Sequence, residues 1–156
     1  MKIKVCGLKY PENIMAVCES GVDFVGFIFY DKSPRFVNDS MSFDEARVIQ
    51  TKKVGVFVNE RIYSVVNTIA HYDLDFVQLH GDESPAYCEE LRPNVKVIKA
   101  FGINETFNFT MLKQYEKVVD YFLFDTATPN HGGSGERFDL SLLKNYKLNI
   151  PFCLSV

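Results

Sequence analysis

The feature that most constrains this chain is a repeated pairing of a short apolar run with a stretch of helical spacing. The apolar runs are rich in β-branched and aromatic residues and are bounded by glycine, proline or polar residues, as buried strands are. Strands are expected at 2–6, 23–30, 53–58, 76–80, 95–101, 121–124 and 150–154. This alternation predicts a parallel α/β sheet, and no linker or shift in composition divides the range 1–156 into more than one domain.

Local start and stop signals place helices between these strands. Pro11 stands at a first helical turn and Gly21 ends that helix, whereas Ser42 and Glu45 form a capping box at the start of the next helix. Further helices are expected at 60–72, 84–91, 108–114 and 138–144. Two architectures fit this alternation, an open doubly wound sheet and a (β/α)₈ barrel, and the periodicity alone does not choose between them.

Composition and charge exclude several classes of protein. The 156 residues are 47% hydrophobic and 24% charged, which is typical of a globular domain with a substantial core. Seventeen basic and 20 acidic residues give a net charge of −3 with no basic stripe, so nucleic acid is not an expected partner. No apolar run approaches the roughly 20 residues of a membrane span, and no signal peptide is recognisable, so a cytoplasmic location without membrane partners is expected.

The cysteines give no sign of a metal site. Cys6, Cys18, Cys88 and Cys153 lie far apart and show neither a CxxC nor a CxxxH spacing. In a reducing compartment each is expected to be a small buried apolar residue rather than half of a disulfide. The cysteines therefore suggest no zinc site.

Polar residues are expected together where the strands end. The run 121–124 is followed by Asp125, and this position at the carboxyl end of a parallel strand is where α/β sheets build their active sites. The other strands and their loops deliver further polar groups to the same edge, namely Cys6, Arg35, Asn59 and His80. Apolar strand interiors beneath these groups would favour shifted pKa values.

Cys6 and Asp125 are the strongest candidates for chemistry at this edge. A thiolate can remove a proton from carbon and a protonated carboxyl can donate one, so the two could form an acid–base couple. The alternatives are that Cys6 is simply a small buried residue and that Asp125 caps the loop that follows it.

The other candidates also have a structural alternative. His80 could be a hydrogen-bonded structural histidine, and Arg35 a solvated charge, although its planar fork suits a carboxylate or phosphate. Lys99, inside an apolar strand, could reach solvent or a carboxylate at the rim. The glycine-rich loop with Gly133, Ser134 and Gly135 could wrap an anion or be plain flexible loop, and it lacks the Lys-Ser/Thr ending of a P-loop.

A series of ordered motifs carries a family resemblance. The motifs are KVCGL at 4–8, GFIF at 26–29 with SPR at 33–35, VGVFVN at 54–59, VQLHG at 77–81, IKA at 98–100 and LFDT at 123–126 with GGSG at 132–135. In this order they closely resemble the phosphoribosylanthranilate isomerases, (β/α)₈-barrel enzymes of tryptophan biosynthesis.

The resemblance implies an activity and a set of site residues. It implies an Amadori rearrangement of N-(5-phosphoribosyl)anthranilate into its 1-deoxyribulose 5-phosphate isomer, without metal or cofactor. By position, Asp125 would be the general acid and Cys6 the general base, and Arg35 would bind the anthranilate carboxylate. The resemblance also implies further substrate-binding positions, at His80, Gln78, Gly133, Ser134 and Gly135.

The chain departs from the family at its carboxyl end. The family continues beyond the seventh strand with the seventh helix and the eighth βα unit, which carry most of its phosphate site. The expectation is a barrel lacking its last quarter, with about six βα units and the start of a seventh strand. Open strand edges would favour self-association. The alternative function is therefore an inactive barrel that only binds ligand or oligomerises.

Overall fold

The strands pair in the order in which they occur in the sequence, and every pairing is parallel. The computed structural model describes residues 2–37, 40–127 and 139–155. Its strands are β1 (Lys4–Cys6), β2 (Phe24–Ile28), β3 (Lys52–Phe57), β4 (Phe76–Leu79), β5 (Lys96–Ile103), β6 (Tyr121–Thr126) and β7 (Phe152–Leu154). A doubly wound sheet would reverse its order at a switch point, so the consecutive order is that of a barrel.

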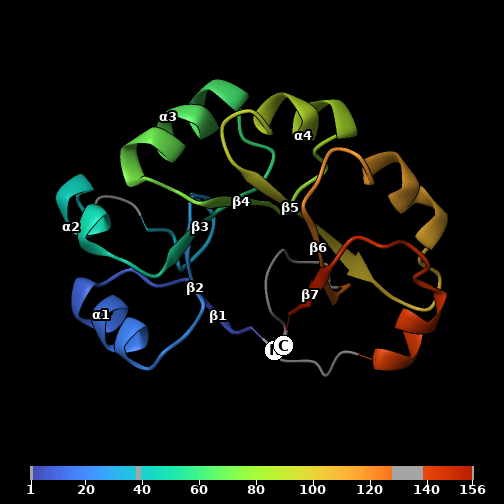
Figure 1. Cartoon of the computed structure of the whole chain (residues 1–156), viewed down its shortest axis with the longest axis horizontal. Coiled ribbons are helices and arrows are strands. Elements are labelled where there is room, and N and C mark those ends of the chain that lie inside the picture. Colours follow the sequence, from blue (N-terminus) through green and yellow to red (C-terminus); the bar gives the residue numbers. More distant parts are fainter. Residues whose placement is uncertain (1, 38–39, 128–138, 156) are drawn as a thin grey trace.

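Helices connect the strands and lie on the convex side of the curved sheet (Figure 1). The α-helices are α1 (Pro11–Glu19), α2 (Phe43–Val48), α3 (Ile62–Tyr72) and α4 (Pro85–Leu91). The predicted capping box is confirmed, because the Ser42 hydroxyl accepts from Glu45 N and the Glu45 carboxylate accepts from Ser42 N. Gly21 follows the end of α1 with φ +81°, a conformation that glycine adopts at little cost.

Two of the predicted helices are 3₁₀ helices instead. They are η2 (Phe109–Tyr115) and η3 (Leu140–Asn145), and the described part of the chain resumes at Asp139, after the predicted start of the second one. In both, an Asx side chain accepts from the backbone N–H two residues on, Asn108 from Thr110 and Asp139 from Ser141. Such bonds favour tight turns, and the short segments lack a long apolar stripe that would reward a full α-helix.

The sheet curls into an arc with β1 and β7 at its two ends (Figure 1). In the described residues, β1 pairs only with β2 and β7 only with β6. The curled sheet and its outer helices are therefore those of an open (β/α) barrel.

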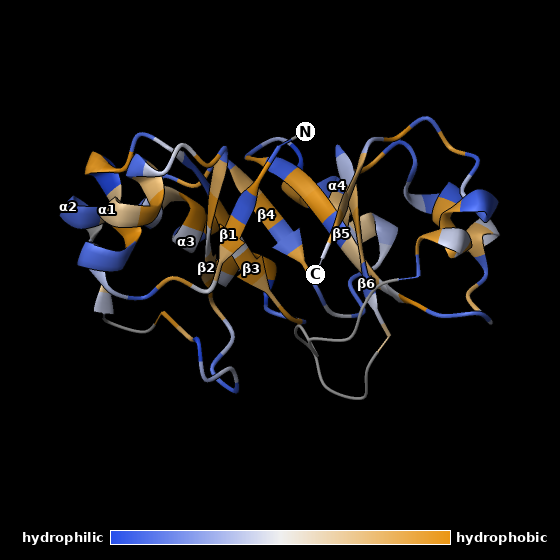
Figure 2. Cartoon of the chain, turned by 90° about the horizontal axis from the view of Figure 1, so that it is seen from below, coloured by the Kyte–Doolittle hydropathy of each residue, from blue (hydrophilic) through white to orange (hydrophobic). Residues whose placement is uncertain are grey.

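The two faces of the sheet have separate apolar clusters. The larger one packs the outer face against the helices and includes Phe27, Phe57 and Phe122. The smaller one lies on the inner face and consists of Val54, Phe76, Ile98, Ala100 and Leu123. The strands in Figure 2 are mostly coloured as hydrophobic, as expected for a sheet that is covered on both faces.

The alternation of side chains along the strands assigns the candidate residues to the inner face. Cys6 is opposite Gly26, which is opposite Val54 of the inner cluster. Asp125 lies two residues after Leu123, another member of that cluster. Because residues two apart on a strand share a face, these polar groups stand on the concave side, above the inner apolar cluster.

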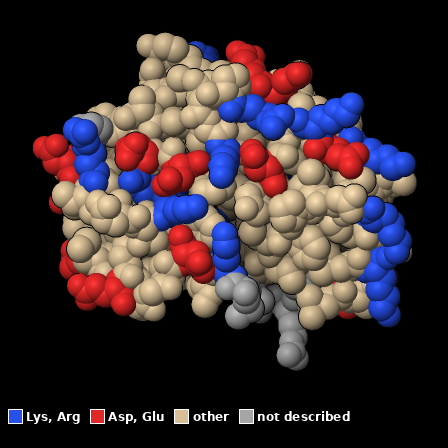
Figure 3. Space-filling view, in the orientation of Figure 1, with Lys and Arg blue, Asp and Glu red and all other residues tan. Residues whose placement is uncertain are grey.

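Charged side chains of both signs share one face of the molecule. Lysine and arginine are interspersed with aspartate and glutamate over much of the face in Figure 3. Among the described residues, no helix is long and apolar enough to cross a membrane.

Candidate active site

Asp125 is held at the end of β6 by its own backbone and faces a histidine. Only 7% of the residue is exposed. Its Oδ1 accepts from Thr126 N at 2.9 Å, and its Oδ2 lies 3.6 Å from His80 Nε2. The predicted loop-capping role is thus present in part, while the second oxygen remains directed at another rim residue. A carboxyl beside an imidazole can take part in proton transfer.

His80 follows β4 and contacts residues of β3 and β4 as well as Asp125. Its backbone N–H donates to Phe57 O at 2.9 Å, which extends the pairing of β3 with β4. Its Nδ1 lies 3.0 Å from Nε2 of Gln78, a side chain that is only 3% exposed. Lys4 of β1 donates in turn to Gln78 Oε1. The motif residues Gln78 and His80 therefore join Asp125 in one line of polar groups across the concave face.

Cys6 sits at the end of β1 in a space that depends on a glycine. The residue is partly exposed, and its thiol is free of any disulfide. A Cβ added at the opposite residue, Gly26, would lie 2.7 Å from Cys6 Sγ and 3.2 Å from Cys6 Cα. Since real contacts of a Cβ are essentially never that short, glycine at position 26 is what leaves room for the thiol.

Arg35 lies against the turn that follows Cys6. A Cβ added at Gly7 would lie 2.7 Å from Cδ of Arg35 and 3.2 Å from its Nε. Arg35 and His80 also line one small cavity of about 40 Å³, together with Ile28, Tyr30, Ser33, Val56 and Val58. Arg35 is an exposed residue, so its guanidinium can meet an anion beside this cavity.

Lys99 is buried on the helix side of the sheet. Its side chain is 1% exposed and forms an ion pair with Glu83 at 3.2 Å. Its Nζ also donates to the carbonyls of Leu79, Gly81 and Ala100. Burial lowers the pKa of Lys99, and the Glu83 carboxylate opposes that shift. The sequence predicted that the Lys99 side chain reaches either solvent or a carboxylate at the rim. The carboxylate, that of Glu83, is correct, and solvent is wrong.

Glu83 ties together the loops that follow β3 and β4. Its carboxylate accepts from Asn59 N at 2.8 Å and from Gly81 N at 3.0 Å. Asn59 has φ +52°, and its side chain accepts from Asp82 N. Asn59 thus supports the loops, whereas its position at a strand end had suggested a role at the rim. Sequence analysis missed Glu83, because nothing local distinguishes a buried glutamate in a polar loop.

The remaining predicted loop residues lie outside the part that the structure describes. Gly133, Ser134 and Gly135 belong to the range 128–138. In the described ranges there is no group of three or more His, Cys, Asp or Glu side chains arranged to hold a metal ion. The described part of the site thus offers acid–base groups and one cationic fork.

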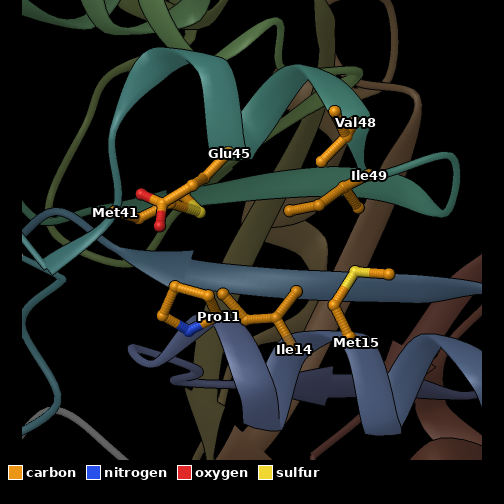
Figure 4. A pocket seen from close by; sticks show the side chains of 7 residues that line it. All are labelled: Pro11, Ile14, Met15, Met41, Glu45, Val48 and Ile49. Atoms are coloured by element: carbon orange, nitrogen blue, oxygen red, sulfur yellow. The ribbon is translucent and has the colours of Figure 1, made fainter.

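A second cavity lies away from this rim, between α1 and α2 (Figure 4). Its volume is about 60 Å³, and it is lined by Pro11, Ile14, Met15, Met41, Glu45, Val48 and Ile49. The Glu45 carboxylate is already engaged in the capping box. This cavity has no convergent polar groups, so the rim of the strands is the better candidate for chemistry.

Comparisons with known proteins agree with this geometry. A family model described as N-(5'phosphoribosyl)anthranilate (PRA) isomerase matches residues 3–155. The N-(5'-phosphoribosyl)anthranilate isomerase of Parabacteroides distasonis is 46% identical over 99% of this chain and 72% of its own length. The one of Phocaeicola vulgatus is 41% identical over 99% of this chain and 75% of its own length.

Solved structures show the same likeness. Phosphoribosyl anthranilate isomerase from Thermotoga maritima superposes with a TM-score of 0.82 at 34% identity, over 99% of this chain and 76% of that one. Another, in complex with reduced 1-(o-carboxyphenylamino)-1-deoxyribulose 5-phosphate, gives a TM-score of 0.62 at 29% identity, over 82% and 76% of the two chains.

Proposed function

Because this chain belongs to the N-(5'-phosphoribosyl)anthranilate isomerase family, we propose that it isomerises N-(5-phosphoribosyl)anthranilate with Cys6 as general base and Asp125 as general acid. Membership in the family makes the chain an isomerase of tryptophan biosynthesis. The assignment of the two residues, and the expected cytoplasmic setting without nucleic-acid or membrane partners, are proposals.

The proposed reaction needs one acid and one base. Asp125 protonates the oxygen of the furanose ring, the bond from that oxygen to C1 breaks, and the nitrogen lone pair forms a Schiff base. Cys6 as thiolate then removes the proton from C2, and the electron pair gives an enolamine. Loss of the proton from the C2 hydroxyl and addition of a proton at C1 produce the ketone, so the net reaction is an isomerisation.

Arg35 is proposed to bind the carboxylate of the anthranilate ring. The planar guanidinium can donate two parallel hydrogen bonds to such a group. Its contact with Gly7 keeps it beside the turn that carries Cys6, and it borders the cavity that His80 also lines. Gln78 and His80 are proposed to complete this side of the substrate site, and Gly133, Ser134 and Gly135 its anion-binding loop.

The observation that carries this proposal is the shared inner face of Cys6 and Asp125. Both stand at carboxyl ends of strands, above the inner apolar cluster, with Arg35 in the loop between β2 and α2. A reacting molecule over that rim can contact a thiol, a carboxyl and a cation from different strands, which is how barrel enzymes assemble their sites.

The test is turnover of freshly prepared N-(5-phosphoribosyl)anthranilate by the wild type and by Cys6→Ala and Asp125→Asn. Both variants should lose turnover by at least about a hundredfold, the usual contribution of a positioned acid or base. The matched controls are Cys18→Ala, a second partly exposed cysteine, and Asp82→Asn, an exposed aspartate at the same rim. Wild-type turnover that persists in either site variant would contradict the assignment.

A second proposal concerns self-association through the open strand edges. Within the described residues β1 and β7 each lack a partner on one side, and Phe152 and Leu154 of β7 are exposed. Unpaired backbone groups at such an edge readily pair with another chain. We propose that these edges mediate the self-association that is expected for this chain. The alternative function, an inactive module that only oligomerises, would require the same self-association.

Light scattering after size-exclusion chromatography tests this second proposal. The measured mass of the wild type should exceed that of one 17.9 kDa chain. The measured mass of Leu154→Lys should lie closer to that of one chain. Val48→Lys, which adds the same charge at an exposed aliphatic residue of α2, should leave the wild-type mass unchanged. A monomeric wild type would contradict the proposal. Association without turnover would favour the inactive module over the isomerase.

A further inference from the structure

We propose that Lys4 and Gln78 are positioning residues that hold His80 as the neutral tautomer with its proton on Nε2, facing Asp125. The inference rests on a line of polar side chains that crosses the concave face from β1 to β4 and β6. Lys4 Nζ donates to Gln78 Oε1, Gln78 Nε2 lies 3.0 Å from His80 Nδ1, and His80 Nε2 lies 3.6 Å from Asp125 Oδ2. Lys4 takes part neither in the proposed acid–base step nor in the proposed carboxylate contact.

The first step is the orientation of the Gln78 amide. A lysine ammonium group has three donors and no acceptor, so only the amide oxygen of Gln78 can face Lys4. The amide NH₂ group must then face the other way, toward His80. Because Gln78 is only 3% exposed, a flipped amide would set NH₂ against the ammonium group with little water to compensate.

The second step is the tautomer of His80. In a neutral imidazole one ring nitrogen donates and the other accepts. Since the Gln78 NH₂ group donates to Nδ1, this nitrogen must be the acceptor, and the single ring proton is on Nε2.

The third step links this tautomer to the reaction, and it rests on the proposed function. When Asp125 gives up its proton, a negative charge forms on a carboxyl whose Oδ2 faces His80 Nε2. A ring with its proton on Nε2 can donate to that charge as it forms. The opposite tautomer would present a lone pair to the carboxylate and repel it.

Nitrogen NMR of the protein labelled with ¹⁵N in histidine measures the tautomer directly and needs no turnover. The chain contains three histidines, and a His80→Gln variant identifies the signals of His80. At mildly alkaline pH the wild type should show a pyridine-type signal for Nδ1 and a pyrrole-type signal for Nε2. The opposite pattern in the wild type would overturn the proposal without any variant.

Variants test whether Lys4 and Gln78 determine the tautomer of His80. Gln78→Glu replaces the donor with an acceptor, so Nδ1 should gain a proton and its pyridine-type signal should be lost. Lys4→Met should give a mixture of the two tautomers, and Lys4→Arg, which keeps a donor, should restore the wild-type pattern. Gln50→Glu and Lys2→Met, both at exposed positions, should leave it unchanged. An unchanged Nδ1 signal in Gln78→Glu would overturn the proposal.

Kinetics separate this inference from the proposed function. If both hold, Lys4→Met should lower kcat more than it raises KM, because Lys4 acts on the acid step through His80 and is not part of the proposed substrate site. If the tautomer is as proposed but Cys6→Ala and Asp125→Asn keep full turnover, the proposed function fails and the positioning of His80 stands. If turnover depends on both residues but the tautomer is reversed, only this inference fails.

Discussion

The side chain of Arg35 rests on the backbone of Gly7, the residue that follows Cys6. The Cβ that glycine lacks would stand 2.7 Å from Arg35 Cδ. Gly7 also has φ +82°, a conformation that side chains rarely adopt. Gly7 therefore lies between Cys6, the proposed base, and Arg35, the residue proposed to bind the substrate carboxylate.

Gly7→Ala should impair substrate binding beyond its effect on stability. The new methyl group must displace Arg35, so KM should rise, while the strained φ should lower the free energy of unfolding by about 1–2 kcal/mol. Gly21→Ala is a matched control, because Gly21 has φ +81° but nothing lies within 4 Å of the added Cβ. Urea unfolding should show a similar stability loss in both variants. A similar rise of KM in Gly21→Ala would contradict the contact argument.

Gly26→Ala should disturb the thiol of Cys6. The added Cβ would stand 2.7 Å from Sγ, so the thiol must move away from its place at the end of β1, and kcat should fall. Gly55→Ala in the adjacent strand is the control, because its Cβ would meet Leu74 and Phe57 instead. Steady-state kinetics should show the larger loss of kcat in Gly26→Ala, even if Gly55→Ala is the less stable protein. Equal kcat values would argue against this placement of the thiol.

Glu83→Gln should destabilise the fold by about 3 kcal/mol at neutral pH, because it leaves the buried charge of Lys99 unpaired. Chemical unfolding measures this loss. The double variant Glu83→Gln with Lys99→Met removes both charges, so it should recover part of this lost stability. Glu89→Gln, on the exposed face of α4, should change little.

The loss of unfolding free energy in Glu83→Gln should become smaller as pH rises. Burial already lowers the pKa of Lys99 in the folded state, and Glu83 opposes this shift, so the variant should lower that pKa further. Between the lowered pKa and the ordinary value of lysine, the unfolded chain binds more protons than the folded one. The free energy of unfolding must then increase with pH in that window. A loss that grows toward alkaline pH would contradict this account.

Cys88 should resist alkylation for as long as the protein stays folded. It is fully buried in α4, and burial raises the pKa of its thiol to about 11, although Lys99 acts in the opposite direction. Because the thiolate is the reactive form, iodoacetamide at neutral pH should label the partly exposed Cys6 and Cys18 before Cys88. Mass spectrometry of peptides gives the order, and early labelling of Cys88 in folded protein would contradict it.

Much of the element pattern was predictable because its signals are local. Three of these signals each depend on residues that are close together in the sequence. They are the apolar run before Asp125, the helix start at Pro11 and the capping box at Ser42. The ends of η2 and η3 were close to the predictions, but the 3₁₀ geometry was not anticipated, since short Asx-capped turns and short helices share the same residues.

The sequence by itself determined which residues end the strands, and thereby that Cys6, His80 and Asp125 reach one rim. That follows from the period of two along a strand and from the common direction of parallel strands. Only the tertiary structure decided the consecutive strand order, the pairing of Lys99 with Glu83, the contact of Arg35 with Gly7 and the line from Lys4 through Gln78. These contacts join residues far apart in the chain, and their geometry depends on how the sheet curls, which no local pattern records.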